Sequence, residues 1–187
     1  MIRFTLLSVL MLGAILTVNT LNSQAQPVPV AVYLFEQDAS DEKGSYDGTL
    51  EGDAAIVEDA ERGNVLYQTE TGYVSISPKL ADTLEHFSFT AWVNYNGTVE
   101  WAGLMGMGMI EYNGWPYWDY HIRSDQTMSY YSSKVNRFPS ESTCMHVPAS
   151  SYILPKQEWV HLAFSFTQNQ GATVYANGEA LDQVTWC

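Results

Sequence analysis

Aromatic side chains gather in the stretch WPYWDY (115–120), which holds four rings in six residues. Flat rings of this kind offer a large apolar surface on which a sugar ring can stack, while neighbouring polar groups bond its hydroxyls. Successive residues of a strand point to opposite faces, so Trp118, Tyr120 and Ile122 share one face of the run WDYHIR. We expect that face to belong to a protein core.

The residues just before this run have the composition of an exposed loop. YNGWPY (112–117) contains two turn signals, the Asn-Gly pair and the Trp-Pro bond. Rings in such a loop are free to meet a ligand. We therefore predict a glycan-binding site formed mainly by Trp115 and Tyr117, with Tyr112 and Asn113 as further contacts.

Carboxylates are concentrated in a second stretch that also holds two glycines, DASDEKGSYDG (38–48). Calcium takes about six to eight hard oxygen ligands from carboxylates and carbonyls. The candidate ligands for Ca2+ are Asp38, Asp41 and Asp47. Their spacing is not that of an EF-hand, and a solvated acidic loop explains the same residues equally well.

The first residues have the pattern of a secretory signal peptide. Arg3 precedes an apolar run (4–18), and the small residues Ser23 and Ala25 stand at the −3 and −1 positions of a cleavage site. The apolar run is shorter than the roughly 20 residues that a membrane span needs. We expect a signal peptide over 1–25, export to the cell surface, the medium or the periplasm, and no membrane insertion after cleavage.

Charge and cysteine usage narrow the class of partner. The chain has 8 basic and 21 acidic residues, a net charge of −13, which repels nucleic acid and anionic membranes. Neither is expected as a partner, whereas Ca2+ and neutral glycans are compatible. The two cysteines, Cys144 and Cys187, have no zinc-type spacing. In an exported chain they are candidates for one disulfide.

The rest of the chain (27–187) reads as one domain of short strands. Alternation is clearest in HFSFTAWVNY (86–95), and residues 158–167 and 172–181 look like a hairpin. GLMGMGMI (103–110) is expected to be a buried strand, and the only helix candidate is 77–85. These signals predict an all-β, two-sheet antiparallel jelly-roll sandwich.

Three large side chains in the predicted strands are expected to stabilise the fold and not to bind a ligand. Trp92 and Trp159 are large rings, which we expect to fill the space between the sheets. His161 is interpreted as a structural histidine, because nothing near it in sequence suggests a catalytic or metal-binding partner.

Three segments resemble one family in order and spacing. FTAWVNY (89–95), EWVHLAFSF (158–166) and VYANGEAL (174–181) look like the best-marked segments of the laminin-G-like jelly roll, in the concanavalin A-like lectin/glucanase superfamily. The stretch 33–54 resembles the opening strand and acidic loop of that family. The resemblance favours calcium in this loop. Family domains usually continue for a few strands past the last of these segments, so we expect the chain to lack its final strands.

The same superfamily includes β-glucanases, so the resemblance raises the possibility of an enzyme. Retaining glycosidases need two carboxylates about 5–5.5 Å apart. The nearest candidate, EQDASDE with Glu36, Asp38 and Asp41, ends in Asp rather than Glu and runs into a glycine-rich loop. Glu111 has no acidic neighbour in sequence until Asp119. We therefore expect no catalytic residues.

The sequence as a whole favours an exported, non-catalytic carbohydrate-binding or cell-surface adhesion module, whose partner is a glycan or a cell-surface protein. A β-glucanase-like glycoside hydrolase is the first alternative. A protein–protein interaction domain of a larger surface protein is the second.

Overall fold

The structure is a computed structural model that describes residues 27–77, 80, 86–97, 101–108, 116–132, 147–148, 152–167 and 171–184. Its internal contacts divide the chain into two units, Met1–Val30 and Ala31–Cys187. In the first unit, the described residues 27–30 are exposed. The predicted signal peptide (1–25) lies outside the described residues. Among the described residues, no helix has the length and hydropathy of a membrane span.

The second unit is built from β-strands. In chain order they are β1 (Thr49–Glu51), β2 (Ala55–Asp59), β3 (Gly63–Tyr67), β4 (Tyr73–Ser75), β5 (His86–Asn94), β6 (Ala102–Gly108), β7 (Pro116–Ile122), β8 (Met128–Ser132), β9 (Val147–Pro148), β10 (Trp159–Thr167), β11 (Gly171–Ala176) and β12 (Glu179–Val184). Most of the helix candidate at 77–85 lies outside the described residues, and Leu80 forms a 3₁₀ turn whose N–H bonds the Ser77 carbonyl at 3.1 Å.

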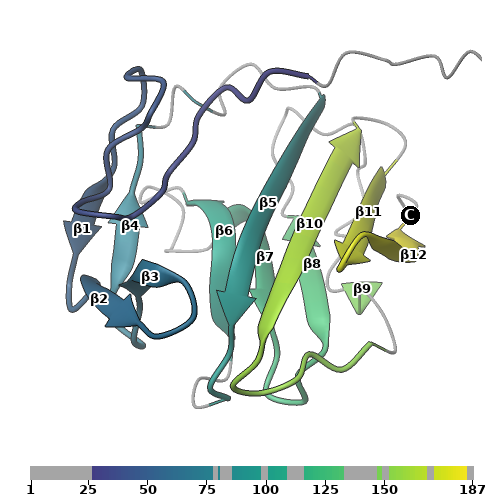
Figure 1. The fold of residues 1–187 in the computed structure, drawn as a ribbon. Coiled ribbons are helices and arrows are strands. Elements are labelled where there is room, and N and C mark those ends of the chain that lie inside the picture. The colour runs from purple at the N-terminus through teal and green to yellow at the C-terminus, as the bar shows by residue number, and fades with distance from the viewer. Residues whose placement is uncertain are drawn as a thin grey trace, which may run out of the picture. The chain divides into compact units, whose positions relative to one another are not determined.

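Most strands of this unit lie in two four-stranded sheets (Figure 1). The strand order is β12-β11-β10-β5 in one, which we call the front sheet, and β6-β7-β8-β9 in the other, the back sheet. Two smaller ladders, β1-β4 and β2-β3, complete the arrangement, and the strands in every ladder run antiparallel. The chain is thus an all-β antiparallel jelly-roll sandwich, and the predicted fold class is confirmed.

The alternation of residue types sets which face of each strand is buried. In β10 every second residue is buried, starting at Val160, and its partners on β5 are the half-buried alternate residues from Phe87 to Val93. Tyr120 of the back sheet stacks on Phe164 of the front sheet, with ring centroids 5.1 Å apart. The core therefore lies between the two sheets, where removing these apolar side chains from water stabilises the fold.

Tyr120 and Ile122 are each 1% exposed, as the alternation of WDYHIR predicted, while His121 on the opposite side of the strand is also buried, at 2%. Both sides of the strand are thus covered at this point. The methionine-rich run is a strand as far as Gly108, where the described residues of this segment end, and Leu104 and Met105 pack half-buried, not fully buried, against the core.

The expectation for the two tryptophans was wrong. Trp92 is 49% exposed and points away from the back sheet, and Trp159 is only half-buried. The reason is its position in the strand, where residues an even number apart point to the same face. Trp92 is two residues from Thr90 and four from Ser88, whose side chains point outward, so Trp92 also points outward. A large ring was given more weight than its position in the strand.

Candidate functional site

The acidic loop is held together by one of its own carboxylates. Asp41 is 4% exposed, and its chain segment pairs antiparallel with Tyr33 through an isolated bridge. Its two carboxylate oxygens accept four backbone N–H groups at 2.8–3.2 Å, from Val32, Lys43, Ser45 and Tyr46. Desolvation raises the pKa of Asp41, and the four N–H groups lower it. The four hydrogen bonds together have the larger effect, so the pKa of Asp41 lies below its ordinary value.

The two other candidate calcium ligands also bond within the loop. Asp47 accepts the N–H of Asp41 at 2.9 Å, and Asp38 accepts the N–H of Ser40 at 2.8 Å. Within the part of the chain that the structure describes, no three His, Cys, Asp or Glu side chains form a group able to hold a metal ion. The structure therefore does not bring Asp38, Asp41 and Asp47 together as a ligand set, and binding of Ca2+ by this protein stays a prediction.

Asp41→Asn is expected to lower the melting temperature at pH 7 by several degrees, because the amide leaves N–H groups of the loop facing another N–H group. The depressed pKa makes this contribution depend on pH. The stabilisation is present above the unfolded-state pKa of about 3.9 and is lost as the pH falls through the folded-state pKa. Thermal unfolding from pH 8 to pH 2 should therefore show the two proteins converging only below about pH 4. Glu42→Gln, an exposed change of the same charge in the same loop, is the control; a constant difference at every pH would contradict the assignment.

The outer face of the front sheet, the face turned away from the back sheet, has an unusual composition over the three strands β5, β10 and β11. Its side chains come from alternate positions of β5, β10 and β11. None of these three strands contains Asp, Glu, Lys or Arg, although the chain carries 21 acidic residues. The face is instead made of hydroxyl, imidazole, amide and aromatic groups and one alanine, namely His86, Ser88, Thr90, Trp92, Asn94, Trp159, His161, Ala163, Ser165, Thr167, Thr173 and Tyr175.

A shallow, open depression of about 360 Å³ lies on this face. Its lining residues are Ser88, Thr90, His161, Ala163, Phe164, Ser165, Tyr175 and Gly178. Ser88 and Ser165 face each other across two paired strands, and the hydroxyl of Ser88 donates to that of Ser165 at 3.3 Å. Small side chains therefore leave room above the sheet, and hydroxyl groups line the space.

The turn between β11 and β12 forms one border of the depression. Asn177 and Gly178 both have positive φ, 50° and 85°, as the Asn-Gly pair predicts for a tight hairpin. The side-chain oxygen of Asn177 accepts the N–H of His161 at 3.0 Å, and its own N–H donates to the His161 carbonyl at 2.8 Å. These two bonds fix the turn against β10 beside the imidazole.

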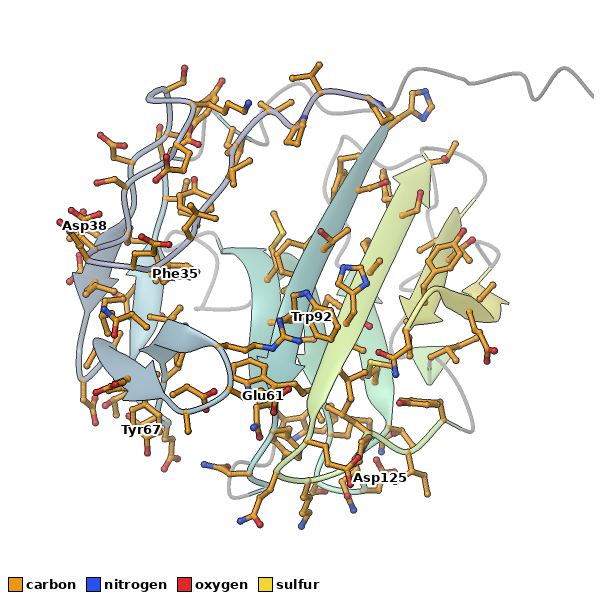
Figure 2. The ribbon with its side chains drawn as sticks, in the orientation of Figure 1. Phe35, Asp38, Glu61, Tyr67, Trp92 and Asp125 are labelled. Carbon is orange, nitrogen blue, oxygen red and sulfur yellow. The ribbon has the colours of Figure 1, made fainter. Side chains whose placement is uncertain are left out.

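Trp92 lies beside the depression, next to its lining residue His161. It pairs directly with His161 in the ladder, and the two rings lie 5.2 Å apart at 57°. The guanidinium of Arg62 lies 3.6 Å from the centre of the Trp92 ring and 5.2 Å from that of Trp159. Arg62 belongs to the turn of the β2-β3 hairpin, so this hairpin reaches the outer face at Trp92 (Figure 2).

The hairpin turn is fixed by Asp59. Its carboxylate accepts the backbone N–H groups of Glu61 and Arg62, both at 3.0 Å, and the indole N–H of Trp159 at 3.3 Å. One carboxylate thus shapes the turn and ties it to β10. Arg62 is held where it can stack on Trp92.

The residues predicted to bind a ligand are placed as follows. Tyr112, Asn113 and Trp115 lie outside the described residues, as do Cys144 and Cys187. Tyr117 lies in β7, which begins at Pro116, and not in the turn before it as predicted. Glu36 and Asp38 are exposed in the acidic loop. The sequence analysis missed the outer face, although the parity of Trp92 with Ser88 and Thr90 was a signal for it.

Comparisons with known proteins agree with this fold. A family model described as the concanavalin A-like lectin/glucanases superfamily matches residues 68–185. Domain 4 of AbnA, a GH43 extracellular arabinanase from Geobacillus stearothermophilus solved in complex with arabinotriose, is similar with 20% identity and a TM-score of 0.59, over 83% of this chain and 74% of that chain. A carbohydrate esterase from the Shiga toxin-encoding bacteriophage phi24B matches at 14% identity and a TM-score of 0.39, over 83% of each chain. No curated protein matches the chain.

Proposed function

Because the chain belongs to the concanavalin A-like lectin/glucanases superfamily, we propose that it is an exported module that binds a glycan without cleaving it. The glycan lies on the outer face of the front sheet, in the depression between Trp92 and Tyr175. The observation that carries this proposal is a depression lined by hydroxyl, imidazole and aromatic groups, with no Asp, Glu, Lys or Arg, in a chain with a net charge of −13.

The chemistry of this face suits a chain of neutral sugars. Aromatic rings at Trp92 and Tyr175 supply apolar surface, and hydroxyls at Ser88, Thr90 and Ser165 supply donors and acceptors. The arabinanase domain was solved with arabinotriose bound, and its similarity to this chain supports a sugar as the class of ligand to test first.

Two alternatives of a different class follow from the same fold. A glycoside hydrolase would need a pair of carboxylates about 5–10 Å apart, and no carboxylate lines the described depression. A surface-protein interaction domain, acting in cell adhesion, would use the same face for a protein. A second location for the glycan is the aromatic stretch at Trp115 and Tyr117, as the sequence predicts.

A glycan array with the mature chain, followed by calorimetry on the best ligand, tests the proposal. Tyr175→Ala is expected to weaken binding about tenfold, since an aromatic contact contributes about 0.5–1.5 kcal/mol beyond its buried area. The matched control is Tyr67→Ala, which removes an exposed tyrosine of β3. Trp115→Ala reports on the second location.

Each other outcome overturns part of the proposal. Loss of binding in Trp115→Ala with none in Tyr175→Ala would move the site to the aromatic stretch. Oligosaccharides released from the bound glycan over a day, detected by mass spectrometry, would make the chain a hydrolase. An array with no glycan bound would favour a protein partner.

A further inference from the structure

We propose that Arg62 recognises a single carboxylate on the bound glycan, so that the preferred ligand is a neutral sugar chain carrying an isolated uronic acid. This inference rests on the proposed glycan site on the outer face of the front sheet. It adds a class of substituent and a residue that recognises it.

The first support is the position of Arg62. Its guanidinium stacks on Trp92 at 3.6 Å and lies 5.2 Å from the Trp159 ring. Among the described residues, its side chain has these two ring interactions and no recorded ion pair with a carboxylate. Asp59, a carboxylate of the same turn, accepts the backbone N–H groups of Glu61 and Arg62 and the indole N–H of Trp159.

The second support is the geometry that stacking imposes. A guanidinium is a planar group with five N–H donors and no acceptor. A ring beneath it holds the plane but takes none of the in-plane donors, so they remain directed outward along the surface. A carboxylate matches two of these donors at once, whereas a sugar hydroxyl matches one. Arg62 is therefore prepared to recognise a carboxylate at the Trp92 end of the depression.

The third support is charge. The depression itself has no charged lining residue, so the sugars that it holds are neutral. A net charge of −13 opposes the approach of a polyanion, because each further negative sugar adds repulsion that one arginine does not offset. One carboxylate beside Arg62, on an otherwise neutral chain, satisfies both conditions.

Matched pairs of oligosaccharides test the inference: xylotriose with its glucuronic acid-substituted form, and a neutral galacto-oligosaccharide with its form bearing one galacturonic acid. Calorimetry on each member gives an affinity ratio within the pair. The acidic member is expected to bind about tenfold more tightly, the effect of one charge-assisted pair. In Arg62→Gln the ratio should fall to about one, and Arg62→Lys should retain only part of it because lysine lacks the planar fork.

The matched control is Arg123→Gln, which removes another arginine near an aromatic ring, 5.5 Å from Trp101, and should leave the ratio unchanged. Equal affinity of the native chain for both members would overturn the role of Arg62 while the glycan site stands. An absence of binding to every member, and to the glycan array, would overturn the proposed function itself. Retention of the preference in Arg62→Gln would place the recognition of the carboxylate elsewhere.

Discussion

Trp92→Ala is expected to weaken glycan binding by about 30-fold or more, the effect of losing an aromatic residue that contributes at least about 2 kcal/mol to an interface. The substitution removes the largest exposed ring of the outer face, at 49% exposure. It also removes the support beneath Arg62, whose guanidinium lies 3.6 Å from that ring. Both losses act on the same end of the depression, so this variant should be more severe than Tyr175→Ala.

The matched control is Trp101→Ala. Trp101 is similarly exposed, at 47%, and also has an arginine near its ring, but it lies next to β6 of the back sheet. Calorimetry with the array-selected glycan should show little change for this variant. The opposite pattern, with Trp101→Ala weakened and Trp92→Ala normal, would place the ligand on the other sheet. Unchanged thermal unfolding of both variants is needed to attribute the loss to binding.

Phe164→Ala is expected to lower the free energy of unfolding by about 3–5 kcal/mol, the range for truncating a buried phenylalanine. Phe164 is 1% exposed. It stacks on Tyr120 of the back sheet at 5.1 Å and lies 6.0 Å from Phe87 of the neighbouring strand. A single truncation therefore opens a cavity where the two sheets meet.

Urea unfolding followed by tryptophan fluorescence measures this difference. Ser165→Ala changes the next residue of β10, which points to the outer face, and should alter stability by about 0.5 kcal/mol or less. A small effect of Phe164→Ala, below about 1 kcal/mol, would mean that the sheets are not joined through this ring. The comparison also checks the parity on which the outer face depends.

Local pattern was enough to predict the sheets. Alternation in 86–95 predicted a strand, and 158–167 with 172–181 predicted a hairpin; the structure has β5 over His86–Asn94 and pairs β10 antiparallel with β11. The Asn-Gly turn between β11 and β12 was also predictable, because two adjacent positive φ angles favour those residues. These features depend on residues that are close in sequence.

The candidate site was not predictable in this way, because its contacts join distant segments. Asp59 bonds Trp159, which is 100 residues away in the chain, and Arg62 stacks on Trp92. The pattern of residue types within β2, β3, β5 or β10 does not indicate that the β2-β3 hairpin contacts the front sheet. The role of Asp41 was missed for a related reason: an acidic loop looks the same in sequence whether its carboxylates face a cation or backbone N–H groups.

The match to the family model begins at residue 68, whereas the hairpin that carries Asp59 and Arg62 ends at Tyr67. The framework of the sandwich and the group proposed to select its ligand therefore occupy separate stretches of the chain. No residue of this hairpin belongs to the buried core cluster between the sheets, so replacing the hairpin would change the groups beside Trp92 and leave that cluster in place. The same separation makes residues 55–67 the natural segment to exchange when a new selectivity is to be engineered.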